Sequence, residues 1–215
     1  MRRLKGAEGD GPGVLGPVFD SLRMRLSRPS LKVRLLVMLA AVPLITWFAV
    51  KPVRVVAPTL VGMSCLNPSV CVDDPTRLVQ AAGLYAEGMA FVPDLLGSFK
   101  SKPRVIFCST QACADAFGLG ARAAVTLGTW GTVIGPRAWE SYFVRHELIH
   151  YAQAERIGTL RLLFKPQWFV EGMAYALSQD PREPLTEPFE SQRRRFRAWY
   201  AAVGKQGLWQ AARDL

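Results

Sequence analysis

The sequence predicts an α+β fold, in which a short mixed or antiparallel sheet packs on a helix at residues 139–155. Three observations support this prediction. Short β-prone runs separated by glycines lie between residues 104 and 135, a pattern typical of a hairpin. Two later segments, 139–155 and 167–178, have the pattern of helices and begin a helical C-terminal part. An uncharged run at 35–50 precedes all of these elements and predicts one transmembrane helix.

The first 34 residues predict a basic, disordered, cytoplasmic tail. They contain eight Lys and Arg against three Asp and Glu, which gives +5 of the chain's formal net charge of +10. Their many glycines and prolines leave few side chains for a packed core. The remaining 181 residues share the other +5, and they show no basic segment interleaved with aromatic residues. We therefore expect no nucleic-acid partner.

Residues 35–50 predict a transmembrane signal-anchor. As a helix, this run spans about 24 Å, less than a hydrocarbon core of about 30 Å. Arg34 and Lys51 can extend toward the two surfaces, and Trp47 suits an interface. The basic side is N-terminal, so the expected location is single-pass in the cytoplasmic (inner) membrane, with the rest of the chain periplasmic or extracellular. A cleaved signal peptide is the alternative.

All four cysteines follow this run, at positions 65, 71, 108 and 113. An even number of cysteines beyond a membrane signal predicts disulfides in an oxidising compartment. Three pairings are possible, and the two local ones, Cys65–Cys71 and Cys108–Cys113, are our prediction. Free buried thiols are the alternative.

The remaining elements follow from caps, turns and periodicity. Residues 51–72 predict a linker, mostly extended. Asp74 and Pro75 predict a capped helix start, and that helix runs to about Met89. The other elements, in chain order, are a strand at 104–108, a helix at 110–117, strands at 121–126 and 131–135, and helices at 190–203 and 206–214.

Residues 146–150 read His-Glu-Leu-Ile-His and contain both histidines of the chain. Residues four apart lie on one face of a helix, so His146 and His150 can present two imidazoles to one Zn²⁺ ion. Glu147 can reach a water on that metal and act as a general base. The alternative is a surface helix with scattered polar residues.

Glu171 is a lone acid on the otherwise apolar segment that follows Pro166. Burying a carboxylate is costly unless a cation meets it, and a zinc ion held by two histidines would be that cation. Gly172 predicts a close approach of this helix to the 139–155 helix. An acid that faces solvent is the alternative.

The patterns H-E-x-x-H at 146–150 and W-F-x-E-G-x-A at 168–174 resemble the gluzincin group of zinc metallopeptidases, with a peptidase MA-like domain. The resemblance implies a zincin-like domain over residues 73–215. It also implies the site residues, namely Zn²⁺ ligands His146, His150 and Glu171, and Glu147 as the catalytic base.

Two further residues or segments gain a role from the resemblance. Several gluzincins carry an acid four residues after the ligand glutamate, where this chain has Tyr175. This tyrosine is a candidate to contact a ligand histidine, and core packing is its alternative role. Apart from the resemblance, Tyr175 and Tyr200 are unranked candidates to stabilise the oxyanion. The resemblance also implies that residues 132–134 form an edge strand that pairs with substrate, and an interior strand is the alternative.

The segment between the two helices, 157–165, is rich in leucine and predicts core packing, with membrane contact as the alternative. The predicted function is a membrane-anchored, extracytoplasmic, zinc-dependent peptidase that acts on a peptide or protein substrate. One alternative is an inactive zincin-fold binding or scaffold module at the membrane. Another is a hydrolase of a different amide, such as one in cell-wall peptide.

Overall fold

The computed structural model describes residues 30–215, so most of the tail predicted at residues 1–34 lies outside the described residues. The chain divides into two units, which meet between Val42 and Pro43. Helix α1 (Leu31–Ala49) spans this boundary, and all other elements belong to the second unit.

Helix α1 covers nearly all of the predicted signal-anchor at 35–50, and many of its apolar side chains are exposed. Within residues 30–215, no helix is both long enough and apolar enough to cross a membrane. The predicted transmembrane helix is therefore not found in the structure. Lys32 and Arg34 occupy the first turn of α1, so the uncharged part of this helix begins only after Arg34. Pro43 lies within that uncharged part.

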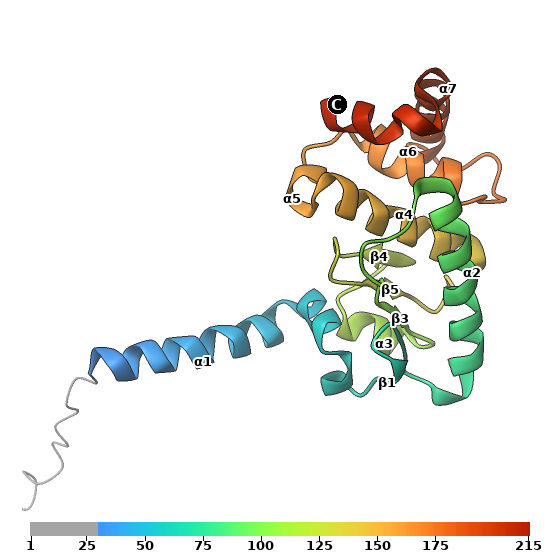
Figure 1. The fold of residues 1–215 in the computed structure, drawn as a ribbon. Helices are drawn as coiled ribbons and strands as arrows, with labels where there is room; N and C mark the ends of the chain where they lie inside the picture. Colours follow the sequence, from blue (N-terminus) through green and yellow to red (C-terminus); the bar gives the residue numbers. More distant parts are fainter. Residues whose placement is uncertain (1–29) are drawn as a thin grey trace, which may run out of the picture. The chain divides into compact units, whose positions relative to one another are not determined.

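The second unit is built around a five-stranded mixed sheet with the strand order β1-β2-β3-β5-β4 (Figure 1). Strands β2, β3 and β5 run parallel to one another, and β1 and β4 are antiparallel to their neighbours at the two edges. The strands are β1 (Ser64–Asn67), β2 (Val70–Val72), β3 (Val105–Phe107), β4 (Ala124–Thr126) and β5 (Thr132–Ile134).

The two faces of this sheet bury different clusters because side chains alternate along each strand. In β3, Val105 and Phe107 belong to a cluster of 21 buried residues, whereas Ile106 belongs to a cluster of nine. We call these two sides the helix face and the disulfide face. Helices α2 (Leu78–Leu96) and α4 (Ser141–Ile157) pack directly on the helix face.

The disulfide face is covered by short elements. These are η1 (Lys51–Val56), η2 (Pro58–Val61) and α3 (Gln111–Ala116). Disulfides join Cys65 to Cys71 and Cys108 to Cys113, which confirms the predicted pairing. Both bonds have one cysteine in the cluster of nine buried residues.

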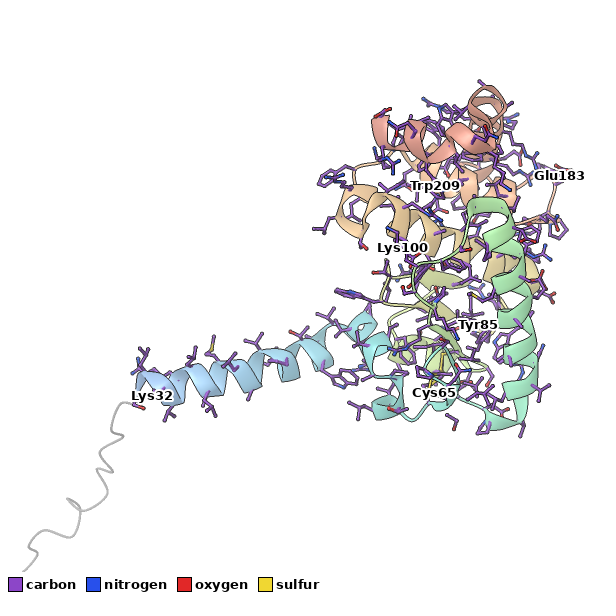
Figure 2. All side chains as sticks on the ribbon, viewed as in Figure 1. Lys32, Cys65, Tyr85, Lys100, Glu183 and Trp209 are labelled. Carbon is purple, nitrogen blue, oxygen red and sulfur yellow. A yellow bond between two sulfur atoms is a disulfide. The ribbon has the colours of Figure 1, made fainter. Side chains whose placement is uncertain are left out.

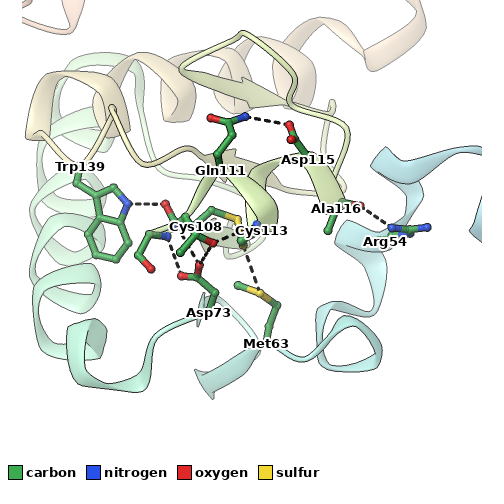
Figure 3. The surroundings of a disulfide bond; sticks show 11 residues. Arg54, Met63, Asp73, Cys108, Gln111, Cys113, Asp115, Ala116 and Trp139 are labelled. Atoms are coloured by element: carbon green, nitrogen blue, oxygen red, sulfur yellow. Dashed lines mark hydrogen bonds between the residues drawn. A yellow bond between two sulfur atoms is a disulfide. The ribbon is translucent and has the colours of Figure 1, made fainter.

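The Cys108–Cys113 disulfide is surrounded by contacts that join β2, β3 and α3 (Figure 3). Asp73, at the end of β2, accepts hydrogen bonds from the Ser109 amide (2.7 Å) and from the Thr110 amide (3.2 Å). The indole Nε1 of Trp139 donates to the Cys108 carbonyl at 2.9 Å. The segment just before α4 is thereby held to the end of strand β3.

The predicted helices are found with shifted ends. Asp74 caps the helical segment that begins at Pro75, as predicted, and accepts a hydrogen bond from the Thr76 amide. Helix α2 runs seven residues past Met89, to Leu96. The last helix, α7 (Phe189–Asp214), is kinked at Gly204, where φ is 71°, so it corresponds to the two helices predicted at 190–203 and 206–214. Trp209 ties its second half to α2 by donating to the Leu96 carbonyl at 3.0 Å (Figure 2).

Three local predictions differ from the structure. Residues 51–72, predicted as a linker, contain η1, η2 and the first two strands of the sheet. Strand β5 (residues 132–134) is interior, between β3 and β4, as the alternative had it, so the edge strand on this side of the sheet is β4. Gly172 lies against α7 instead of α4: a Cβ added there would meet the Gln192 carbonyl oxygen of α7.

Candidate metal centre

Helix α4 presents both histidines on one face, as their spacing predicts. Their rings meet edge to face with centroids 4.8 Å apart, and the two Nε2 atoms are 3.1 Å apart. Both side chains are largely buried, at 10% and 13% exposure for His146 and His150. Two imidazole nitrogens therefore converge on one small volume at the wall of α4.

Helix α6 (Gln167–Leu177) brings the third polar group to the same place. The Glu171 Oε2 atom lies 3.6 Å from His146 Nε2 and 3.7 Å from His150 Nε2. Ligands around a tetrahedral zinc ion, with bonds of about 2.0–2.1 Å, are separated by roughly 3.3 Å. The three observed separations are within about half an ångström of that value, so this group could hold a metal ion.

The electrostatics of the three residues favour a cation among them. Burial raises the pKa of Glu171, but hydrogen bonds from His146 and His150 outweigh it and hold this pKa well below its usual range. Burial lowers the pKa of His150, but the hydrogen bond and charge of Glu171 outweigh it and raise this pKa to about 9. A buried carboxylate thus needs a positive partner here, which is either a proton on an imidazole or a metal ion.

Gln153 orients one of the two imidazoles, and the sequence reasoning did not identify it. Its Oε1 atom lies 2.9 Å from His150 Nδ1, and its Nε2 donates to the Val170 carbonyl of α6 at 3.0 Å. With the Nδ1 proton bonded to Gln153, the Nε2 atom of His150 is free to ligate a metal. The only sign of this role in the sequence is a polar residue three positions after the second histidine. In the structure Gln153 is fully buried.

Glu147 points toward the sheet, where strand β4 meets its carboxylate. The Thr126 hydroxyl donates to Glu147 Oε2 at 2.7 Å, and the Thr132 hydroxyl lies 2.8 Å from that of Thr126. Glu147 is only 6% exposed. This chain of hydroxyls fixes a carboxylate beside the first histidine, and Thr126 is a second residue that the sequence reasoning missed.

Of the two predicted tyrosines, the structure brings only one to this site. The Tyr175 ring lies edge to face against His146, with centroids 4.4 Å apart. Burial raises the pKa of Tyr175 to about 12, so its hydroxyl keeps its proton at neutral pH and remains a donor. Tyr200 instead stacks on Phe196 at 5.4 Å and does not line the cavity around the histidines.

A cavity of about 760 Å³ surrounds the convergent groups. Its walls come from strand β4 (Ala124–Thr126), from α4 and α6, and from the first turn of α7. The cavity is large enough for several residues of a peptide. One wall is thus the edge strand of the sheet, and the other carries the three possible metal ligands.

Comparison of the chain with protein-family models, with curated proteins and with solved structures finds no match. The interpretation of the site therefore depends on its own geometry. That geometry brings together His146, His150 and Glu171 as the sequence predicts, with Glu147 and Tyr175 next to them.

Proposed function

We propose that this chain is a zinc-dependent peptidase of the gluzincin type that works outside the cytoplasm. The observation that carries the proposal is the convergence of two imidazoles from α4 and one carboxylate from α6 on one point in a cavity. The donor set, two nitrogens and one oxygen, is one that zinc accepts in catalytic sites with a fourth position left for water.

The residues around this point suit peptide hydrolysis. Zinc bound there would polarise the scissile carbonyl and lower the pKa of a bound water. Glu147 would take the proton from that water and pass it to the leaving amine. Thr126 would hold the Glu147 carboxylate in place, and Tyr175 would donate a hydrogen bond to the developing oxyanion.

Strand β4 supports a peptide as the substrate. It is the last strand in the sheet order and lines the cavity, so its outer edge is a place where an extended backbone could add as a further strand. Main-chain hydrogen bonds would then hold the peptide, and the cavity wall would select side chains. The proposed substrate class is accordingly an extended segment of a peptide or protein.

The two disulfides support an extracytoplasmic location. Such bonds persist in oxidising compartments and are rare in the cytosol. The Cys65–Cys71 bond joins β1 to β2, and the Cys108–Cys113 bond joins the residue after β3 to α3, so both lie within the unit that carries the candidate metal site.

The test compares Glu147→Gln with the wild type and with Glu183→Gln, a control at a side chain that is 71% exposed. Zinc content is measured by elemental analysis, and cleavage is measured on a broad peptide library and on cell-wall peptides, with and without chelator. Glu147→Gln is expected to bind zinc like the wild type but to lose at least about 100-fold in cleavage rate. Full cleavage by this variant would remove Glu147 from the mechanism.

The second candidate is a binding module that keeps the metal without turnover. Tyr175 favours it, since this residue stands where several gluzincins carry an acid that supports a ligand histidine. Bound zinc with no cleavage of any library member by the wild type would support the module. Chelator-sensitive cleavage of the cell-wall peptides alone would instead indicate a hydrolase of that amide.

A further inference from the structure

Three large apolar side chains between the two metal-site helices face solvent, contrary to the predicted core packing. Leu160, Leu163 and Phe164 are 75%, 73% and 87% exposed. They belong to helix α5 (Thr159–Leu162) and the turn that follows, whose hydrogen bonds continue the helical path. Their i, i+3, i+4 spacing therefore puts them on one side of this turn, while Leu162 packs inward.

A fourth exposed residue, Trp130, comes from the β4–β5 loop and is 63% exposed. This loop packs on the start of α5, because a Cβ added at Gly128 would lie only 2.5 Å from Thr159. Gly128 and Leu162 also line the cavity of the candidate metal site. We call Trp130, Leu160, Leu163 and Phe164 the apolar tip. Its residues lie on two touching loops that each contribute one residue to that cavity, and Trp130 itself lines a second pocket together with Tyr85 and Lys102.

The charges on these loops have one sign. Between Gly158 and Val170 the charged residues are Arg161 and Lys165, and residues 127–131 contain none. Arg161 is exposed beside Leu160, and Lys165 donates to the Arg213 carbonyl at 2.8 Å. Large apolar side chains with interleaved cations and no acid match the boundary between acyl chains and anionic headgroups.

We propose that the apolar tip docks on an anionic lipid surface. Leu160, Leu163 and Phe164 are exposed on α5 and the turn that follows it, and a bilayer can accept such protruding side chains without a matching groove. Trp130 suits the headgroup level, and Arg161 would meet the lipid phosphates. Docking would bring the cavity to substrate segments that lie close to the membrane. The docking itself does not depend on zinc or on turnover.

The test is hydrogen exchange of the full chain with vesicles of phosphatidylglycerol and phosphatidylcholine, with pure phosphatidylcholine vesicles, and without lipid. Total binding is uninformative because α1 also exposes apolar side chains, so the measurement follows peptides that cover residues 127–131 and 158–165. We expect exchange there to slow by about fivefold or more with the anionic vesicles. This slowing should be weaker with the neutral vesicles and at high salt.

Leu160→Ser/Phe164→Ser should abolish the local protection, and Val79→Ser, at a side chain that is 85% exposed on α2, should keep it. Both variants change exposed side chains and should leave the fold intact. Unchanged hydrogen exchange in the buried strand β3 would verify this. Equal exchange with and without vesicles, or protection that survives the double variant, would overturn the proposal. So would protection that appears without lipid at high protein concentration, because a second copy of the chain would then be the partner.

Discussion

The two faces of the sheet are stabilised in different ways. The disulfide face has nine buried residues, covered by two short 3₁₀ helices and one helix of six residues. One disulfide links β1 to β2, and the other links the residue after β3 to the six-residue helix α3. The helix face has 21 buried residues under long helices and no disulfide in the described part of the chain. Small cores usually need covalent links, whereas a larger core is stable without them.

The larger core also contains the polar groups of the site. His146, Glu147 and Gln153 are all at least 92% buried, and all lie on α4. Burying such groups costs free energy unless each one finds a partner. The candidate site therefore lies on the side of the sheet with the larger hydrophobic core, and the disulfides stabilise the side with the smaller core.

The largest expected effect is the loss of zinc binding in Glu171→Ala. This change removes a direct ligand, and even outer partners of metal ligands are worth 10–100-fold in affinity, so we expect a loss of at least about 100-fold. Zinc at 100 times its dissociation constant stabilises a protein by about 2.7 kcal/mol. Titration calorimetry and thermal unfolding with and without zinc should show that this stabilisation is lost. Glu183→Ala is the matched control, and wild-type affinity in Glu171→Ala would contradict the proposed site.

The same titrations have an expected pH dependence. The pKa of His150 is raised to about 9, so below that pH zinc must displace a proton from the imidazole. The apparent zinc affinity should therefore fall by up to about tenfold for each unit by which the pH is lowered below about 9. In the zinc-free protein the proton on His150 stabilises the fold fully below about pH 6.5, and this contribution is lost as the pH rises through about 9. A zinc affinity that does not change between pH 7 and 9 would contradict this assignment.

Cys108→Ala/Cys113→Ala should lower stability but spare the metal. Opening a loop this short costs about 2 kcal/mol on the chain-entropy model, or roughly 4–8 °C in Tm for a domain of this size. Zinc affinity should stay within about threefold of wild type, since the proposed zinc ligands lie on the other face of the sheet. Thermal unfolding and zinc titration of this variant measure both quantities. A parallel fall in stability and zinc affinity would show that the two faces act as one unit.

The sequence predicted the helices of the site well because their signals are local. The four-residue spacing of His146 and His150 defines one face of a helix, and Pro166 marks the start of the next. The hairpin of β4 and β5 follows from the glycines between Leu127 and Thr132. The two disulfide pairs are local as well, since each joins cysteines five or six positions apart.

The missed features depend on contacts between distant segments. Strand β2 has only three residues and pairs in parallel with β3, which lies more than thirty positions later, so no periodicity reveals it. The edge position of β4 depends on β5 pairing with β3, which is also a non-local contact. Gln153 and Thr126 are single polar residues whose partners, Val170 and Glu147, are near them only after folding.

Thr126 is where the sheet and α4 meet at the proposed site, and the loss of its hydroxyl is the smallest effect we predict. Thr126→Val keeps the shape of the side chain but deletes the hydroxyl that holds the Glu147 carboxylate at 2.7 Å. Because that contact would orient the proposed base and touches no metal ligand, kcat should fall about tenfold, with KM and zinc affinity unchanged. Thr126→Ser restores the hydroxyl and should recover most of kcat. Equal losses in both variants would mean that Thr126 acts through strand packing, and an unchanged kcat in Thr126→Val would mean that α4 alone positions Glu147.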